Sequence, residues 1–248
     1  MNCEKTYKKI VRGTKAYFKK SGVKKAVFGL SGGLDSALAA FVLCDALGSK
    51  NVFALIMPEA KLKNAGDRDD AIELCGKLGI KYEIVPIDVM VSSLSIVPWK
   101  QSKLAKENLR ARIRMVLLYS YSNSRNALVV GTSNKSERKL GYFTKYGDGA
   151  ADIMPLGDLL KTEVRKLAEW RGVPEWILKK KPSAGLRKGQ CDEKDLEACY
   201  VDIDKFLQSL GKRGKKKRTK IPKKKSERLR KRIKENAHKL QQPFVVRA

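Results

Sequence analysis

Several patterns are absent from this 248-residue sequence, and each absence excludes a class of protein. No run of about 18 apolar residues occurs, so we expect no membrane-spanning helix. The stretch 1–21 is rich in lysine and lacks the apolar core of a secretion signal, so we interpret it as an amphipathic helix. The five cysteines contain no CxxC pair. This argues against a disulfide framework, a zinc site or an iron–sulfur site, and favours reduced thiols in the cytoplasm.

Acidic residues are also scarce. The sequence has 54 lysines and arginines against 26 aspartates and glutamates, a net charge of +28. Such an excess favours anionic partners, namely nucleotides, phosphates or nucleic acid. The segment Lys212–Lys239 holds 16 of the basic residues and 2 of the acidic ones, and therefore half of the net charge. Because that run has no aromatic residue on which bases could stack, we expect any nucleic-acid binding through it to be weak and non-specific.

The most informative stretch is a short apolar run, Ala26–Leu30, followed by Ser31-Gly32-Gly33-Leu34-Asp35-Ser36 and then by helix formers. This pattern indicates a buried strand, a tight turn and the start of a helix. Glycines let the backbone approach a ligand closely, and N–H groups at a helix N-terminus bind phosphate. Such turns also occur simply because they are tight. Asp35 stands near the place of the lysine of a Walker loop, which suits a loop that holds pyrophosphate beside Mg²⁺.

The rest of the first half alternates strands and helices, which predicts an α/β fold: a doubly wound parallel sheet with helices on both faces. We expect strands at Ala26–Leu30, Val52–Met57, Tyr82–Ile87 and Ala127–Val130, and helices at Ser36–Leu47, Asn64–Leu78 and Ser102–Ser122. Ligands of such sheets bind at the carboxyl ends of the strands, where the glycine turn would lie. The segment Ile113–Tyr119 is apolar nearly all round, so we expect it to be buried within the chain or against a second copy, in a homodimer.

The second half begins with Gly131–Asp158, whose composition predicts a long functional loop. Helices are expected at Lys161–Arg171, Pro174–Lys180 and Glu193–Leu210, with a loop at Lys181–Gln190. We divide the chain into a domain at 1–210, a basic flexible linker at 211–225, and a C-terminal helix from Ser226 to His238 with its tail, 226–248, which closes on the active site.

Three motifs carry a resemblance to known families. SGGLDS resembles the signature of the PP-loop ATP pyrophosphatases, which cleave ATP between its α- and β-phosphates. The stretches Gly131–Glu137, Gly141–Asp152 and Pro182–Leu186 follow in an order that resembles the NAD synthetase family. The resemblance covers about residue 5 to Leu210 and resumes at Arg232–Lys239. It implies ATP-dependent amidation of deamido-NAD by ammonia, through an adenylate, with release of AMP and pyrophosphate.

The resemblance also implies roles for single residues. Asp35 and Glu137 would hold Mg²⁺ and, with Lys161, form the catalytic group. The ATP contacts would be Gly29, Leu30, Ser31, Gly32, Gly33, Leu34, Asp35, Ser36, Thr132, Lys161 and Ser183. The deamido-NAD contacts would be Arg112, Lys145, Asp152, His238 and Lys239. Each residue also has an ordinary structural interpretation; Asp35, for example, could simply cap its helix.

The sequence departs from the family in places. Ser183 stands where threonine is common, and Met57–Leu62 lacks an expected serine, which leaves the adenine side less defined. No Ser/His/Asp or Cys/His triad is recognisable, and an adenylation that positions a substrate carboxylate needs none. Only about 20 residues precede the first strand, too few for an amidase domain, so we expect the chain to use free ammonia or to receive ammonia from a separate protein. Two alternatives stay open: a PP-loop enzyme that adenylates a tRNA base, and a nucleotide- or nucleic-acid-binding protein without catalysis.

Overall fold

Four strands form one parallel sheet in the order β3-β2-β1-β4. They are β1 (Lys25–Gly29), β2 (Val52–Ile56), β3 (Lys81–Ile84) and β4 (Ala127–Val130) in a computed structural model that describes residues 1–62, 65–210 and 221–246. The chain runs outward from β1 to β3 and then returns to the other side of β1 with β4. The carboxyl ends of β1 and β4 therefore border a crevice where the strand order reverses, the usual ligand site of such sheets. The predicted doubly wound parallel sheet is confirmed.

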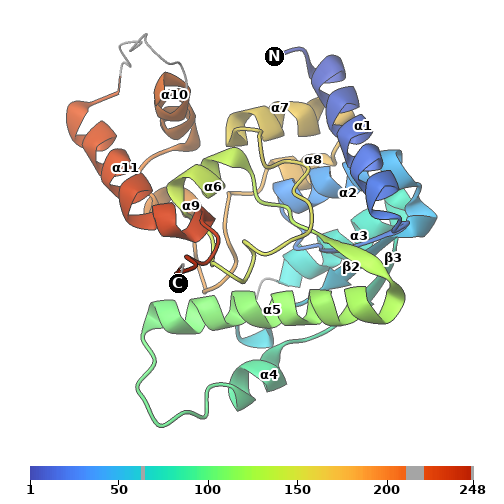
Figure 1. Ribbon diagram of the computed structural model, residues 1–248, viewed down its shortest axis with the longest axis horizontal. Helices are drawn as coiled ribbons and strands as arrows, with labels where there is room; N and C mark the ends of the chain where they lie inside the picture. The colour runs from blue at the N-terminus through green and yellow to red at the C-terminus, as the bar shows by residue number, and fades with distance from the viewer. Residues whose placement is uncertain (63–64, 211–220, 247–248) are drawn as a thin grey trace.

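Helices cover both faces of this sheet (Figure 1). One face packs against α1 (Cys3–Ser21), α2 (Leu34–Leu47), α3 (Ala65–Leu78) and α7 (Lys161–Arg171), with Phe28 and Leu38 fully buried between the layers. The other face packs against α4 (Asp88–Ser93) and α5 (Lys103–Arg125). α2 is apolar all round, because it lies between the sheet and the outer helices α1 and α7.

Two ion pairs join α2 and α7 near their opposite ends. Lys161 contacts Asp35 where both helices begin, and Arg171 contacts Asp45 near their other ends, so the helices run parallel. The Arg171 guanidinium binds both Asp45 oxygens at 2.9 Å. The buried Tyr7 of α1 donates its hydroxyl to the same carboxylate at 2.7 Å. Both helices thus direct the positive ends of their dipoles toward one place.

A separate apolar cluster lies beside the crevice. It joins α6 (Lys135–Leu140), α10 (Tyr200–Leu210) and α11 (Lys223–Asn236) through the buried side chains of Leu140, Phe206 and Leu229. η3 (Ala237–Leu240) continues α11. Figure 1 shows these elements and α9 (Asp192–Asp195) gathered away from α1 and α2. The remaining short elements are η1 (Ser49–Asn51), η2 (Ala60–Leu62) and α8 (Glu175–Leu178).

Several predicted boundaries are wrong. Gly131–Asp158 is not one loop, because α6 lies within it, and α4 follows the third strand at a place where no helix was predicted. The predicted helix Glu193–Leu210 is two helices with a break at which Glu197 has a φ of +50°. α11 begins at Lys223 with Pro222 as its N-cap, so the linker does not extend to residue 225 and Ser226 is no cap. Residues 211–220 of the predicted linker and the predicted cap Asn64 lie outside the described residues.

Candidate active site

The loop between β1 and α2 is shaped to receive an anion. Gly32 has a φ of +74°, and a Cβ there would lie 2.1 Å from the Asp67 carbonyl oxygen, so only glycine fits. The Ser36 hydroxyl donates to the Gly33 carbonyl at 3.0 Å and holds the turn closed. Because the N-cap residue is Gly33, it has no side chain to occupy the first N–H groups of α2. Those groups and the helix dipole favour a phosphate.

Two carboxylates and one ammonium group meet beside this loop. Lys161 Nζ contacts Asp35 Oδ2 and lies 3.2 Å from Glu137 Oε1. Asn134 Nδ2 donates to the other Asp35 oxygen at 2.8 Å, and the Asn134 backbone N–H donates to Glu137 Oε2 at 3.2 Å. The three charged residues come from the first turns of three helices, α2, α6 and α7. Segments more than 100 residues apart in the chain therefore build one charged cluster.

Burial shifts the pKa values in this cluster. Loss of water around Glu137 raises the pKa of its carboxyl to about 7, and Asp35 adds to the shift, although Lys161 opposes it. Burial alone would lower the pKa of Lys161, but Asp35 and Glu137 outweigh burial and hold that pKa above its ordinary value. The ammonium is therefore charged at neutral pH. Glu137 titrates near neutral pH as long as no further cation joins the cluster.

A third buried carboxylate, Asp192, faces the same place. The hydroxyls of Tyr142 and Tyr200 each donate to it at 3.1 Å. Its side chain is nearly inaccessible, and burial raises the pKa of Asp192 although Lys161 lowers it. The Lys161 ammonium also lies 5.2 Å from the centre of the Tyr200 ring. Asp192 thus adds a third negative charge that favours the charged form of Lys161.

This cluster opens into a cavity of about 520 Å³, large enough for a nucleotide. Met57, Pro58, Glu59, Ala60 and Leu62 form one wall, so the segment that lacks the expected serine does reach the cavity. Of the predicted ATP and metal residues, the cavity is lined by Gly29, Leu30, Ser31, Gly33, Leu34, Asp35, Ser36, Thr132, Glu137, Lys161 and Ser183. Gly32 is the remaining member; it lies within the same turn. The structure therefore brings the predicted ATP and metal residues together.

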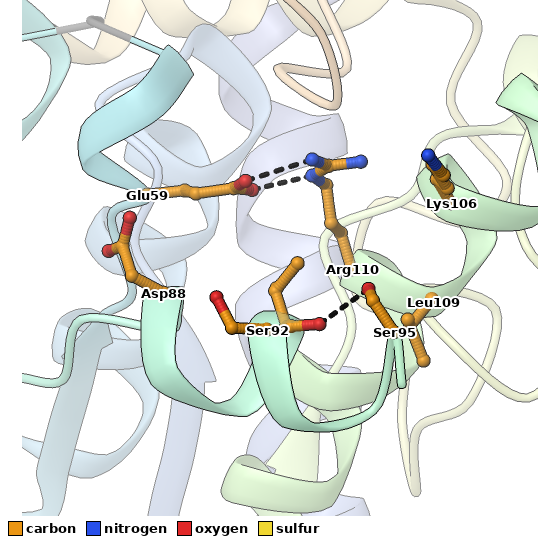
Figure 2. Close-up of a pocket in the computed structure, with 8 residues that line it drawn as sticks. Glu59, Asp88, Ser92, Ser95, Lys106, Leu109 and Arg110 are labelled. Carbon is orange, nitrogen blue, oxygen red and sulfur yellow. Dashed lines mark hydrogen bonds and ion pairs between the residues drawn. The ribbon is translucent and has the colours of Figure 1, made fainter. Parts of the chain in front are cut away.

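A second, smaller cavity of about 190 Å³ lies between α4 and α5 (Figure 2). Its main feature is a bidentate pair in which the Arg110 guanidinium donates to both Glu59 oxygens, at 2.5 and 2.9 Å. Glu59 lines both cavities, and its side chain is almost completely buried. The pair separates the two spaces and fixes the wall on the Met57–Leu62 side of the larger one.

The basic residues predicted to bind deamido-NAD gather outside the larger cavity. Arg112 Nε donates to the Lys145 carbonyl at 3.3 Å, and Lys145 Nζ donates to the His238 carbonyl at 3.0 Å. Lys239 Nζ donates to the carbonyls of Gly141 and Phe143, at 2.7 and 3.0 Å. These basic residues contact segment 141–148 and do not line the cavity. The same segment lines the cavity through Tyr142, Gly147 and Asp148.

Asp152 lies apart from these residues. Its carboxylate accepts the Val129 N–H at 2.7 Å and the Tyr119 hydroxyl at 3.4 Å. It therefore holds the segment around residue 152 against β4, and its predicted contact with deamido-NAD stays a prediction.

Residues 1–62, 65–210 and 221–246 contain no group of three or more His, Cys, Asp or Glu side chains that could hold a metal ion. Asp35 and Glu137 supply two carboxylates, so a metal ion bound to them would need further oxygen ligands from a substrate or from water.

Comparison with known proteins decides the family. The family model described as NAD synthase matches residues 6–243. The chain belongs to the NAD synthase family. It is 47% identical to the NH(3)-dependent NAD(+) synthetase of Archaeoglobus fulgidus over 212 residues, which cover 86% of each chain. It is 45% identical to that of Methanococcus aeolicus over 214 residues, covering 85% of this chain and 84% of the relative.

Solved structures of NAD synthase relatives have the same fold. The NH3-dependent NAD synthetase of Campylobacter jejuni, solved with a nitrate ion, is 34% identical with a TM-score of 0.86, and the match covers 100% of both chains. A structure described as NMN synthetase from Francisella tularensis is 33% identical with a TM-score of 0.90, and the match covers 99% of both chains. The fold predicted from the resemblance is therefore confirmed.

Sequence reasoning missed several residues of this NAD synthase site. Asn134 and Asp192 were not among the predicted residues, although both contact the charged cluster or its supports. The spacing of Asn134 and Glu137 is that of a helix capping box, and it could have placed both at the start of a helix. No sequence pattern singles out Asp192, because its role depends on Tyr142 and Tyr200.

Proposed function

We propose that this protein forms NAD from deamido-NAD, ATP and ammonia, with AMP and pyrophosphate as by-products. The observation that carries the proposal is the contact of Lys161 with both Asp35 and Glu137 at the mouth of a phosphate-binding turn. Similar relatives over most of the chain are named NH(3)-dependent NAD(+) synthetases. Among PP-loop chemistries, the NAD synthase match favours amide formation over modification of a tRNA base.

The acidic pair suits Mg²⁺. Asp35 and Glu137 offer carboxylate oxygens from two helices, and the Lys161 ammonium already lies between them as a cation. Magnesium prefers few protein carboxylates together with phosphate oxygens and water, which matches two acids beside an ATP site. When bound, the ion would reduce the negative charge of the triphosphate and of the departing pyrophosphate. A metal ion at this place would also hold Glu137 in its ionised form.

The protein's own groups would then bring two anions together. The nicotinate carboxylate of deamido-NAD attacks the α-phosphorus of ATP, and the bond to the bridging oxygen of pyrophosphate breaks. Lys161, the N–H groups at the start of α2 and Ser31 would hold the phosphates and offset their repulsion of the incoming carboxylate. Ammonia next attacks the acyl carbon, loses a proton and expels AMP. No side-chain nucleophile takes part, so catalysis consists of positioning and charge stabilisation.

The remaining substrate contacts follow from the cluster outside the cavity. Arg112, Lys145, His238 and Lys239 would bind deamido-NAD: the arginine and the two lysines bring positive charge to the segment 141–148, and the His238 backbone lies against Lys145. In this proposal η3, with His238 and Lys239, closes over the dinucleotide. The division into a domain at 1–210 and a separate C-terminal part stays a prediction; in the structure Leu229 of α11 is buried with Phe206 and Leu140.

We also propose that the protein is a homodimer. Ile113 of α5 is buried, but Val116 on the same helix keeps 59% of its surface exposed. Leu104 at the start of α5 is exposed as well, and so are Ile96 and Trp99 in the segment before this helix. A second copy would cover this apolar face.

None of the described helices is long and apolar enough to cross a membrane. A cytoplasmic location and weak nucleic-acid binding by the tail stay predictions.

The decisive experiment supplies the protein with ATP, Mg²⁺, deamido-NAD and ammonium chloride and measures NAD, AMP and pyrophosphate. We expect all three in equal amounts, and glutamine in place of ammonium should support no synthesis. ADP and phosphate as products would contradict the assignment of the phosphate loop.

A second substrate needs its own arm in this experiment, because the structure described as NMN synthetase matches over 99% of both chains. Nicotinate mononucleotide carries the same carboxylate on a smaller molecule and should be tested at equal concentration. We expect deamido-NAD to have the higher kcat/KM. A preference for the mononucleotide would support the proposed reaction, amide formation with release of AMP, but would contradict deamido-NAD as the substrate.

A further inference from the structure

The outer helix α1 has an arrangement of charge that the synthetase reaction does not use. Its buried side includes Tyr7, Thr14 and Phe18, which pack against the layer of α2 and α7. Its exposed side carries seven basic residues and one acidic residue, Glu4. The seven are Lys5, Lys8, Lys9, Arg12, Lys15, Lys19 and Lys20. This helix alone therefore accounts for a net +6 of the charge of the protein.

Five of these cations form a straight row. Lys5, Lys8, Arg12, Lys15 and Lys19 are spaced by three and four residues in turn, which places them on one face of a helix. We call these five residues the cationic row. It extends over fourteen residue steps, or roughly 21 Å. All five side chains are exposed, and among residues 1–62, 65–210 and 221–246 their only ion pair joins Lys8 to Glu4.

A solvated helix face ordinarily mixes charges of both signs. On α1 the pairs at three- and four-residue spacing are mostly of like sign, as in Lys8 with Arg12 and Lys15 with Lys19. Like charges at these spacings destabilise a helix. Packing of the opposite face holds α1 in place against this repulsion. A polyanion bound to this face would therefore reduce the repulsion between its positive charges.

We infer that the cationic row of α1 is a docking surface for the phosphate backbone of nucleic acid. A duplex carries one negative charge per about 1.7 Å, and lysines that neutralise its phosphates release condensed counterions. The row consists of four lysines and one arginine and contains no aromatic side chain that could stack on bases, so we expect contacts with phosphates and binding that is independent of sequence. An anionic membrane fits less well, because the apolar side of α1 is covered by α2 and α7 and cannot enter lipid.

The test measures binding of the full chain to a fluorescent 20-base-pair DNA duplex by anisotropy, over a range of KCl concentrations. Five neutralised phosphates predict a slope of about −4.5 in log K against log salt, or a roughly 500-fold loss of affinity between 50 and 200 mM. The row variant replaces Lys5, Lys8, Arg12, Lys15 and Lys19 by glutamine. We expect it to lose most of this slope and at least about 100-fold in affinity at 50 mM salt.

The matched control removes the same charge from another basic helix. Its substitutions to glutamine are at Lys223, Lys224, Arg230, Lys231 and Lys234, which are exposed on α11. We expect this variant to keep most of the affinity and slope. Equal losses in the two variants would mean that binding follows net charge alone, and would overturn the proposal. The row variant should unfold cooperatively on heating, as the unaltered protein does, which shows that it is folded.

Two further outcomes would also overturn the proposal. One is the absence of binding by the unaltered protein at 50 mM salt. The other is binding to vesicles that contain about 30% phosphatidylserine, lost in the row variant, without comparable binding to the duplex. Failure of the synthetase assay would not affect this test, because the duplex is measured without ATP or deamido-NAD.

Discussion

Replacing Glu137 by glutamine should make the ligand-free protein more stable and far less active. The folded protein raises the pKa of this carboxyl from an ordinary 4.5 to about 7, mainly through burial. The folded state therefore binds the proton more tightly than the unfolded chain does. The contribution of Glu137 to stability is therefore fully present below pH 4.5, is lost as pH rises toward 7, and does not change above that. A shift of this size corresponds to about 3 kcal/mol.

Glutamine has the shape of the protonated carboxyl and cannot ionise, and its side-chain oxygen can still accept the Asn134 N–H. The variant should differ from the unaltered protein by about 1 kcal/mol or less at pH 5 and exceed it by about 3 kcal/mol at pH 8. For a chain of this size we expect a rise in Tm of roughly 6 to 12 °C. Its kcat should fall at least about 100-fold, because a ligand for the metal and a charge facing ATP are lost.

The assay is thermal unfolding in EDTA without ATP, at intervals between pH 5 and 8. Glu163→Gln is the control, because Glu163 occupies the corresponding position in α7 and accepts the Leu160 N–H at 2.9 Å. It should change neither the stability at pH 8 nor its pH dependence by a comparable amount. The reasoning fails if Glu137→Gln is less stable than the unaltered protein at pH 8, or if the unaltered protein is equally stable at pH 5 and 8.

Four other predictions concern catalysis and assembly. Asp35→Asn should lower kcat at least about 100-fold at saturating Mg²⁺, and near-normal turnover would exclude Asp35 as a metal ligand. Activity with ammonium salts should rise from neutral to mildly alkaline pH, because ammonia and not ammonium attacks a carbonyl; a flat profile between pH 7 and 9 would contradict this. Lys239→Met should raise KM for deamido-NAD and leave KM for ATP nearly unchanged, and the reverse pattern would remove Lys239 from the substrate site. Light scattering should give a dimer at micromolar concentration and a monomer for Val116→Glu; a monomeric unaltered protein would refute the dimer.

Strong periodic patterns and the glycine turn predicted the sheet correctly, because both depend on local residue chemistry. Ala127–Val130 and Lys161–Arg171 match the structure at both ends. The break in the predicted helix Glu193–Leu210 could not be found in this way. No proline or glycine marks it, and Glu197 adopts its left-handed conformation between Asp192 and Tyr200, which are held together by a hydrogen bond of 3.1 Å.

In the candidate site, too, some features could be predicted from the sequence and others could not. Motif order placed Asp35, Glu137 and Lys161 in one group, and the structure brings their side chains into contact. The same reasoning put both acids on loops facing the ligand, whereas each lies in the first turn of a helix. Asp152 was grouped by motif with the basic residues around segment 141–148, yet its contacts are with β4 and Tyr119. Resemblance identifies which residues matter, and only packing shows which of them touch.

The paired ends of α2 and α7 impose a rule on length. Asp35 and Asp45 are ten residues apart, and so are Lys161 and Arg171. The paired residues are therefore separated by the same distance along each helix, roughly 15 Å. One residue inserted into either of these helix segments rotates one paired residue by about 100° relative to the other and moves it 1.5 Å along the helix axis. Both ion pairs could not then form, and Lys161 would leave the acids at the phosphate turn. An insertion in α2 can be accommodated only by a matching insertion in α7, so these two distant segments are bound to change length together.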